Sequence, residues 1–299
     1  MRINKGTKGE KKMNLKMNKV TKTYQHERAL TEIDFHLNPG EIVGLVGPNG
    51  AGKTTLMKIL AGVIVQYEGH AALEDSEKIG SLIEKPKYFP NRSGRYNLNY
   101  FSALYGTPKE TLEEIITSLD LRTYLKKKVK RYSLGMKQRL GIALALVSNP
   151  AYLILDEPTN GMDPDGIRSI LAYLKKLAKE RNIGVLISSH ILKDVEAISD
   201  RVCIIKNGRL VSEYAPSSTI ENLIDLTFED EKDLQHALPL LRELDGFTTH
   251  DTTATFYFDG EMKPLLKQLG NLDIFPREVK RRSATLEDFY FENMEREAK

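Results

Sequence analysis

Hydrophobic and polar positions follow two alternating patterns over most of the chain. Between about Leu15 and Ser212, short apolar runs such as Ile42–Val46 and Ala151–Leu155 are separated by segments with the longer period of amphipathic helices. Strands that alternate with helices predict an α/β fold, in which a mainly parallel sheet is covered on both faces. No unit of about 20 to 50 residues recurs, so the pattern excludes a repeat architecture.

The segment 88–130 interrupts this alternation. It is largely helical in its pattern, with helices predicted over 98–105, 109–118 and 121–128. We therefore expect a helical subdomain, over about residues 86–150, inserted between strands of the sheet.

A second, smaller unit follows the segment Ala215-Pro216-Ser217-Ser218, which predicts a linker because Pro and Ser cluster there. Its predicted elements are a strand (223–228), a helix (232–244), two strands (247–249 and 253–258), a helix (262–269), a strand (274–279) and a helix (286–294). This βαββαβ order favours a small α+β domain with a ferredoxin-like fold. We expect a flexible basic segment (1–13), an α/β domain (14–215) and a C-terminal accessory domain (216–299).

Composition narrows the functional classes. The apolar and charged fractions, 40% and 28%, are those of an ordinary globular protein. No apolar run approaches the ~20 residues that span a bilayer, and the Lys-rich start lacks the apolar region of a secretion signal. A formal charge of +3 gives no general attraction to nucleic acid, and the histidines lack metal-ligand spacing. The single Cys203 indicates a reducing compartment.

The clearest chemical motif is Gly47-Pro48-Asn49-Gly50-Ala51-Gly52-Lys53-Thr54, between an apolar strand and a predicted helix. It matches the phosphate-binding pattern G-x-x-x-x-G-K-[ST] at every fixed position. Glycines let backbone N–H groups curl around phosphate oxygens, and the helix N-terminus adds unpaired donors. We expect this loop and Thr55 to bind a nucleotide, with Lys53 on the outer phosphates and Thr54 on Mg²⁺.

A pair of carboxylates, Asp156-Glu157, ends the strand Ala151–Leu155. The carboxyl edge of a parallel sheet is where α/β proteins bind ligands. We expect Asp156 to coordinate the metal and Glu157 to polarise the attacking water. Strands often end in acidic residues, so the phosphate loop upstream is what favours the chemical interpretation.

Three further segments resemble the signature, D-loop and switch histidine of ABC ATPases. They are Ser133-Leu134-Gly135-Met136-Lys137-Gln138-Arg139, then Gly161-Met162-Asp163, then Ser188-Ser189-His190. The resemblance covers about residues 15–215 and implies the P-loop ABC cassette fold, with ATP and Mg²⁺ as cofactors. In that family two ATPase domains pack head to tail, so the signature of one chain faces the phosphate loop of the other.

This resemblance assigns further roles. Ser133 and Gly135 would bind the γ-phosphate of a second subunit, Asp163 would couple the two sites, and His190 would act in catalysis with Glu157 and Lys53. Tyr24 matches the aromatic residue that stacks on adenine. Simpler alternatives remain open: Ser133 as a plain helix cap, His190 as a structural residue and Tyr24 as a core tyrosine.

Two departures from the family pattern are visible. Where most members have a glutamine that links catalysis to the permease, this chain has Glu84, to which we give a coupling role, with a surface residue as the alternative. In the signature, Leu134 and Met136 replace the usual first glycine and the usual glutamine. Both replacements should change the backbone geometry of the signature segment and its contacts with the ribose.

The departures resemble one branch of the family, the bacitracin- and lantibiotic-resistance exporters. The matching segments are Ile83-Glu84-Lys85-Pro86, Asn97–Phe101, Tyr132–Arg139 and the C-terminal Leu286–Tyr290. In that branch the ATPase and the permease are separate chains. We therefore expect a transport ATPase at the cytoplasmic face of the cell membrane, with a separate permease and a second ATP-binding subunit, as a homodimer or a heterodimer, as its partners.

Two alternatives differ in class. A soluble ABC ATPase acting on ribosomes or DNA usually has two cassettes or a long coiled coil, and this chain has one cassette without room for a coiled coil. A non-catalytic regulatory subunit is suggested by the irregular signature, but every phosphate-handling residue is present. We expect no nucleic acid and no metal beyond Mg²⁺.

Overall fold

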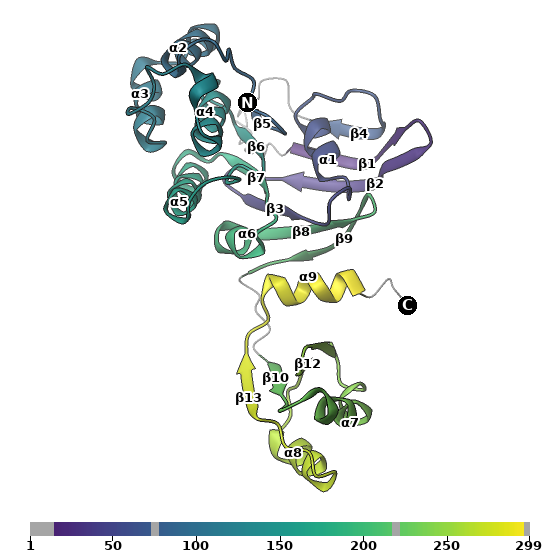
Figure 1. Cartoon of the computed structure of the whole chain (residues 1–299). Helices are drawn as coiled ribbons and strands as arrows, with labels where there is room; N and C mark the ends of the chain where they lie inside the picture. The colour runs from purple at the N-terminus through teal and green to yellow at the C-terminus, as the bar shows by residue number, and fades with distance from the viewer. Residues whose placement is uncertain (1–14, 73–77, 217–221, 296–299) are drawn as a thin grey trace, which may run out of the picture. The chain divides into compact units, whose positions relative to one another are not determined.

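The computed structural model describes residues 15–72, 78–216 and 222–295, which divide into two compact units (Figure 1). The first unit ends at Glu213 and the second, here the C-terminal unit, begins at Tyr214. The flexible segment expected over 1–13 lies outside the described residues, as do Ser217 and Ser218 of the expected linker.

The first unit is built on a six-stranded sheet in the order β5-β6-β7-β3-β8-β9. Its strands are β3 (Ile42–Val46), β5 (Ile79–Leu82), β6 (Tyr152–Asp156), β7 (Gly184–Ser188), β8 (Arg201–Lys206) and β9 (Arg209–Tyr214). The neighbours from β5 to β8 are parallel. Asn207 and Gly208 join β8 to β9, both with positive φ, as in a two-residue hairpin turn.

Both faces of this sheet are buried, as its strand sequences predict. Along β6, Leu153 and Leu155 belong to one core cluster, and Tyr152 and Ile154 belong to another. The helices α4 (Leu134–Leu146), α5 (Pro164–Arg181) and α6 (Leu192–Ile198) contribute to the first cluster. The second contains α1 (Lys53–Leu60) and an antiparallel sheet, β2-β1-β4, formed by β1 (Leu15–Tyr24), β2 (Glu27–Leu37) and β4 (Glu68–Ala72). The parallel-rich α/β architecture is therefore confirmed.

The helical subdomain contains α2 (Gly94–Tyr105), α3 (Lys109–Ser118) and α4. The helix predicted over 121–128 is wrong, because that segment forms turns before a short 3₁₀ turn, Val129–Arg131. Its carbonyls serve another element: the backbone N–H of Arg95 donates to Leu125 at 2.9 Å, and that of Gly94 donates to Lys127 at 3.3 Å. The segment thus satisfies donors at the start of α2, which an uninterrupted helix cannot do.

The C-terminal unit has the elements β10 (Leu223–Thr227), α7 (Glu231–Leu241), β11 (Thr248–His250), β12 (Thr253–Tyr257), α8 (Met262–Asn271), β13 (Glu278–Arg282) and α9 (Leu286–Glu295). The strand order is β11-β12-β10-β13, with antiparallel neighbours. This is the split βαβ arrangement of ferredoxin-like domains. The core lies between the sheet and helices α7 and α8.

The last strand of this unit, β13, begins later in the chain than the apolar residues around Ile274 predict. The predicted strand over 274–279 is wrong, because β13 begins only at Glu278. Asp273 takes a left-handed φ of 62°, which turns the chain, and Ile274 then enters the core from a loop, 2% exposed. Pro276 has no N–H to donate to a strand. The polar segment Glu278–Arg282 pairs instead, at the edge of the sheet.

Candidate nucleotide site

The phosphate loop runs from the end of β3 into α1. Gly50 and Gly52 have φ of 81° and 106°, a region that side chains rarely adopt. A Cβ atom on Gly52 would lie 2.6 Å from the carbonyl oxygen of Ala29. Glycine is therefore required at position 52 for both conformation and space.

Lys53, the first residue of α1, folds back over this loop. Its Nζ donates hydrogen bonds to the carbonyl oxygens of Gly47 at 2.6 Å and Pro48 at 2.9 Å. Burial lowers the pKa of Lys53, while the charges of Glu157 and Asp156 act in the opposite direction. The ammonium group is thus held beside the loop and the two carboxylates.

Asp156 ends β6 with both carboxylate oxygens engaged. Thr54 Oγ1 donates to Oδ2 at 3.0 Å, and Ser188 Oγ donates to Oδ1 at 2.7 Å. One hydroxyl and one carboxylate beside a phosphate loop suit Mg²⁺, which prefers oxygen ligands and usually takes few from protein. Among the described residues, no group of three or more His, Cys, Asp or Glu side chains is arranged so that it could hold a metal ion.

Glu157 occupies a strained position. Its φ is 48°, in the left-handed region, and its backbone N–H donates to Ser188 Oγ at 3.0 Å and to the Ser188 carbonyl oxygen at 3.2 Å. Asn160 Nδ2 lies 3.4 Å and His190 Nδ1 lies 3.6 Å from its Oε2. Strain of this kind in a non-glycine residue collects at functional sites.

These residues line a hollow of about 310 Å³. Its lining consists of residues 49–55 of the loop, Glu84, Asp156, Glu157, and three residues to which the sequence assigns no role: Ala29, Gln138 and Asn160. Gln138 is 6% exposed, and its Oε1 has no hydrogen-bond partner among the described residues. Gln138 belongs to the signature segment, which is expected to face the nucleotide of a second chain. In the structure it lines the nucleotide hollow of the same chain.

The sequence identifies Ser188 only as part of the switch segment. The structure shows that it binds the carboxylate of Asp156 and the backbone of Glu157. This role depends on β6 and β7 being neighbours, with Asp156 paired to Ser188. Strand order is not written in the local sequence, so no motif could have assigned it.

Comparison with known proteins decides the family. Residues 30–160 match the family described as ABC transporter. The bacitracin transport ATP-binding protein BcrA of Enterococcus faecalis is 33% identical over 286 residues, covering 91% of this chain and 93% of BcrA. The chain belongs to the ABC transporter ATP-binding proteins. The relationship expected from its motifs is confirmed, and this family hydrolyses ATP.

Other relatives and solved structures agree with this assignment. The lantibiotic transport ATP-binding protein SrtF of Streptococcus pyogenes is 37% identical, covering 71% of this chain and 96% of SrtF. A solved ATP-binding subunit of an ABC transporter superposes with a TM-score of 0.62 at 26% identity, over 67% of this chain and 89% of that one. A dimeric bacterial ABC cassette gives 0.61 at 24% identity, over 68% and 98%, and shows the fold alone. Nothing in these comparisons favours a ribosome-acting, DNA-acting or regulatory protein.

Several predicted residues of this ABC ATPase lie outside the lining of the hollow: Tyr24, Ser133, Gly135, Asp163 and His190. Ser133 is exposed and caps α4, its Oγ accepting from the Met136 N–H at 3.2 Å. Asp163 caps α5 in the same way, through the Gly166 N–H at 3.2 Å. The helix-cap alternative is thus observed for Ser133, but its hydroxyl hydrogen remains able to donate.

Tyr24 and Glu84 both have exposed side chains. Tyr24 is 46% exposed, so it is not a core tyrosine, and Lys22 Nζ lies 4.9 Å from its ring centroid. Glu84 has a φ of 59° and forms an ion pair with Lys58 of α1 at 2.7 Å. The hydrogen bond from Lys58 holds the pKa of Glu84 below its ordinary value. Among the described residues, no helix of the ABC ATPase is long and apolar enough to cross a membrane.

Proposed function

We propose that this ABC ATPase hydrolyses Mg-ATP between its own phosphate loop and the signature segment of a second ATP-binding subunit, and thereby drives a membrane permease on a separate chain. The observation that carries the proposal is the arrangement around Asp156. Thr54 and Ser188 hold this carboxylate beside the phosphate loop, and Glu157 stands next to it with its side chain at the same hollow.

The protein groups have distinct tasks in this proposal. The N–H groups of the loop bind the phosphates, and Lys53 exchanges its bonds to the Gly47 and Pro48 carbonyls for bonds to the outer phosphates. Thr54 and Asp156 are the residues that would hold Mg²⁺, which neutralises charge on the phosphates during transfer. Thr55 lines the same hollow.

Glu157 is proposed as the general base that orients and deprotonates the attacking water. Its left-handed backbone and the contact with His190 at 3.6 Å support this task, because they fix where the carboxylate can point. His190 has a side chain that is 61% exposed, which leaves room for it to contact a bound γ-phosphate.

A second subunit completes the site. Ser133 and Gly135 lie at the exposed start of α4, outside the hollow of their own chain. The start of α4 has unpaired N–H groups and a partial positive charge, which suit a phosphate supplied by another chain. Gly135 packs close to Gly161, since a Cβ on Gly135 would lie 3.2 Å from the Gly161 carbonyl. This packing supports Asp163 as the link between the two sites.

Glu84 is proposed to connect ATP hydrolysis to the permease. It lines the nucleotide hollow and also a second hollow, of about 440 Å³, between the segment 79–87 and helices α2 and α4. Phe101, Tyr105 and Leu144 provide apolar surface there. We propose this second hollow as the place where a cytoplasmic part of the permease binds, so that the chain works at the cytoplasmic face of the membrane.

The proposed cargo is an antimicrobial peptide. BcrA and SrtF are named for bacitracin and lantibiotic transport, and the likeness to BcrA extends into the C-terminal unit, since it covers 91% of this chain. The permease determines the cargo, so reconstitution with the partner permease and measurement of bacitracin or lantibiotic export are required to test this part.

The nucleotide mechanism is tested by light scattering of the Glu157→Gln variant with and without Mg-ATP. We expect its mass to double on adding Mg-ATP, because hydrolysis no longer reopens the dimer. The Lys53→Ala variant in the same background is the control and should remain a monomer. The two-subunit site is contradicted if the Glu157→Gln variant binds ATP but its mass does not change on adding Mg-ATP, even when the permease is present.

A further inference from the structure

Leu134 stands in the signature segment where the family usually has its first glycine. It is the first residue of α4, and it is 52% exposed. Its side chain nevertheless packs within its own chain, on Gly161 of the D-loop segment Gly161–Asp163. A Cβ atom on Gly161 would lie 2.3 Å from Leu134 Cδ2 and 3.0 Å from Leu134 Cβ. The leucine thus occupies the space that any side chain at position 161 would need.

The backbones of the two segments also approach each other closely. A Cβ atom on Gly135 would lie 3.2 Å from the Gly161 carbonyl oxygen and 3.4 Å from Met162 Cγ. Gly161 has a φ of 73°, in the left-handed region that glycine adopts without strain. The start of α4 and the D-loop segment are therefore shaped to fit each other, with Leu134 filling the space that Gly161 leaves open.

The turn that ends at Gly161 begins at the proposed base, Glu157. The Asn160 N–H donates to the Glu157 carbonyl oxygen at 3.2 Å, and Asn160 Nδ2 lies 3.4 Å from Glu157 Oε2. The Met162 N–H closes the turn by donating to the Thr159 carbonyl oxygen at 3.2 Å. Packed side chains and hydrogen bonds of this kind carry a displacement from one segment to the next. A shift at Gly161 therefore changes where the Glu157 carboxylate points.

We propose that Leu134 couples the two ATP sites of the dimer, by transmitting the state of the signature segment to Glu157 of the same chain. When the signature segment binds the γ-phosphate held by the other chain, Leu134 presses on Gly161 and sets the turn that carries Glu157. The inference rests on the proposed function, since it requires a second subunit whose ATP the signature segment binds. Leu134 is a positioning residue, because it acts through Glu157.

The consequence is that each base becomes active only after its own chain has bound the ATP of the other chain. Hydrolysis should then depend on ATP cooperatively, with a Hill coefficient of about 2, the number of sites in the dimer. A glycine at position 134 has no side chain to reach Gly161, so it could not make this link. The leucine that departs from the family pattern thus serves the coupling between sites, a task separate from binding the phosphate.

ATP hydrolysis by the full-length chain, measured over a range of ATP concentrations at saturating Mg²⁺, tests the coupling. Leu134→Ala removes the Cγ and Cδ atoms beside Gly161 and changes no other residue of the site. We expect its Hill coefficient to fall to about 1, because the two sites then act independently. Binding of Mg-ADP to the phosphate loop, measured by calorimetry, should be unchanged. Leu134→Met keeps an apolar side chain of similar volume and should restore the cooperative dependence.

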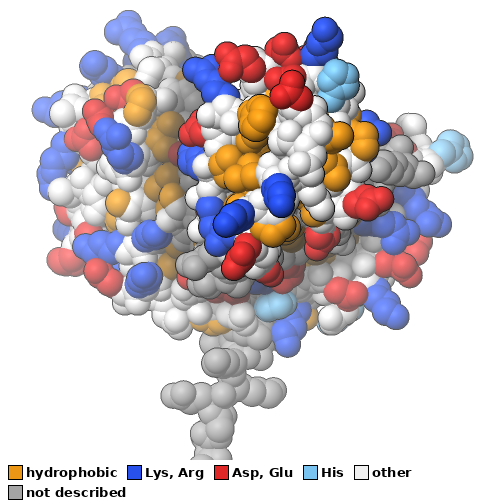
Figure 2. Space-filling model, turned by 90° about the horizontal axis from the view of Figure 1, so that it is seen from below, with side chains coloured by type: hydrophobic (Ala, Val, Ile, Leu, Met, Phe, Trp, Pro, Cys, Tyr) orange, Lys and Arg blue, Asp and Glu red, His pale blue; other side chains and the backbone are white. Residues whose placement is uncertain are grey.

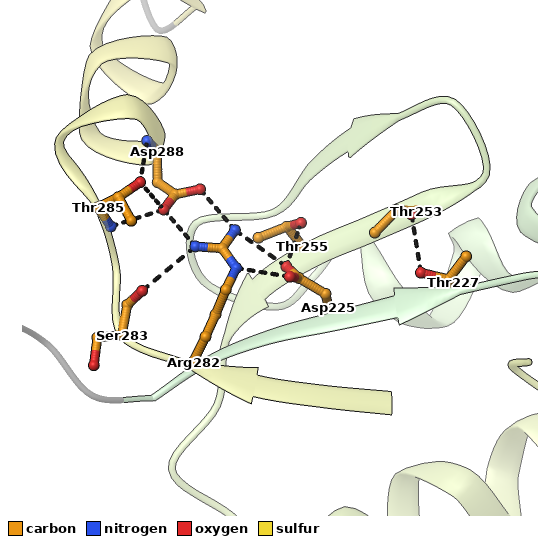
Figure 3. Close-up of polar contacts among 8 residues, drawn as sticks. All are labelled: Asp225, Thr227, Thr253, Thr255, Arg282, Ser283, Thr285 and Asp288. Carbon is orange, nitrogen blue, oxygen red and sulfur yellow. Dashed lines mark hydrogen bonds and ion pairs between the residues drawn. The ribbon is translucent and has the colours of Figure 1, made fainter. Parts of the chain in front are cut away.

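Two variants of the C-terminal unit are matched controls. Leu272, at the end of α8, is also 52% exposed. Figure 2 shows hydrophobic side chains exposed at the end of this unit where α8 lies in Figure 1. Arg282 binds Asp225 of β10 and Asp288 of α9, as Figure 3 shows, so Arg282→Gln weakens the fold away from the nucleotide site. Leu272→Ala and Arg282→Gln should both keep the wild-type Hill coefficient, because neither touches the contact at Gly161.

The contact between Leu134 and Gly161 is tested separately, by thermal unfolding without nucleotide. Gly161→Ala adds a methyl group that overlaps Leu134 Cδ2. It should therefore lower the melting temperature more in the chain with Leu134 than in the Leu134→Ala chain, as expected for residues in contact. Equal losses would mean that the left-handed φ at position 161 causes the whole effect, and would overturn the contact on which the coupling rests.

The outcomes separate this inference from the proposed function. If Glu157→Gln dimerises with Mg-ATP but Leu134→Ala remains as cooperative as the wild type, the coupling role is overturned and the two-subunit site stands. A wild-type Hill coefficient of about 1 in a chain that dimerises has the same meaning. If Glu157→Gln never dimerises, even with the permease present, the proposed function itself fails and the coupling fails with it, whatever the unfolding measurements show.

Discussion

The two units of this ABC ATPase use their charged residues in opposite ways. In the first unit, Asp156 and Glu157 both line one hollow: the hydroxyls of Thr54 and Ser188 bind the Asp156 carboxylate, Asn160 and His190 lie next to the Glu157 carboxylate, and among the described residues no guanidinium binds either one. In the C-terminal unit, Arg282 binds two carboxylates at once. The first arrangement leaves negative charge ready for a cation and a reacting water, whereas the second neutralises its charges within the fold. The contrast separates the residues that we propose to take part in ATP hydrolysis from residues that position a helix.

The largest effect should come from removing the proposed base. We expect Glu157→Gln to slow ATP hydrolysis by about 10² to 10⁴, the usual size of a general-base contribution, without loss of nucleotide binding. Phosphate release under saturating Mg-ATP measures the rate. Glu180→Gln, on the exposed end of α5, is the control and should hydrolyse ATP normally. Near-normal turnover of Glu157→Gln would remove the base from the mechanism.

Ser188 provides a finer test within the same unit. Ser188→Ala takes away a hydrogen bond to Asp156 and one from the Glu157 N–H, but changes neither carboxylate. Groups that orient a metal ligand are typically worth about 10 to 100-fold in metal affinity or activity. We expect a loss of that size in hydrolysis, with a higher Mg²⁺ requirement. Unchanged Mg²⁺ dependence would mean that Ser188 only supports the fold.

In the C-terminal unit, removal of a charged side chain should lower stability without changing ATP hydrolysis by the isolated chain. Arg282→Gln leaves Asp225 and Asp288 without their cation, which we expect to cost about 2 to 3 kcal/mol of local stability because hydrogen bonds to charged groups have that size. Hydrogen exchange of the α9 amides measures it. Arg281→Gln is the matched control, since within the described part of the chain the Arg281 guanidinium makes a single 3.5 Å contact, with the Gly260 carbonyl. Equal exchange in both variants would contradict the role given to Arg282.

Low pH should weaken the contact between Arg282 and Asp288. Burial favours protonation of Asp288, but hydrogen bonds from Arg282 and Thr285 prevail and hold its pKa below the ordinary value. Because the folded-state pKa is depressed, the contribution to stability is complete above the ordinary pKa, about 3.9, and is lost as pH falls through the folded-state value. Asp288→Asn should remove this pH dependence of α9 exchange, and its persistence in that variant would assign it to another group.

The smallest effect is expected for the exposed pair of Glu84 and Lys58. Ion pairs of this kind contribute about 0 to 1 kcal/mol, so Glu84→Gln should leave the urea midpoint nearly unchanged. If Glu84 couples hydrolysis to the permease, the variant should instead change transport per ATP in the assembled complex. A variant that alters neither quantity returns Glu84 to the class of surface residues.

Parts of the site could be predicted because their chemistry is contiguous. The phosphate loop and the Asp156-Glu157 pair need only a strand, a turn and a helix in sequence, and the structure places these residues around one hollow. Ser188 and Gln138 could not be assigned in the same way, since their contacts depend on which strands and helices become neighbours.

The two errors of the fold prediction have a related cause. The segment 121–128 resembles a helix locally, but its carbonyls bind the start of α2, and Ile274 is apolar like a strand residue although it reaches the core from a loop. In both cases a long-range contact prevails over local preference. The α/β architecture and the βαββαβ order do not depend on such contacts, because they follow from the periods of the apolar residues.

The polar sequence of β13 has a consequence for solubility. A strand at the edge of a sheet offers unpaired backbone groups to any other strand, and charged side chains discourage that pairing. Glu278, Lys280 and Arg281 are exposed on β13, so another chain that approached this edge would have to desolvate several charges at once. This edge therefore protects the C-terminal unit from joining other sheets into aggregates while the nascent protein awaits its partners.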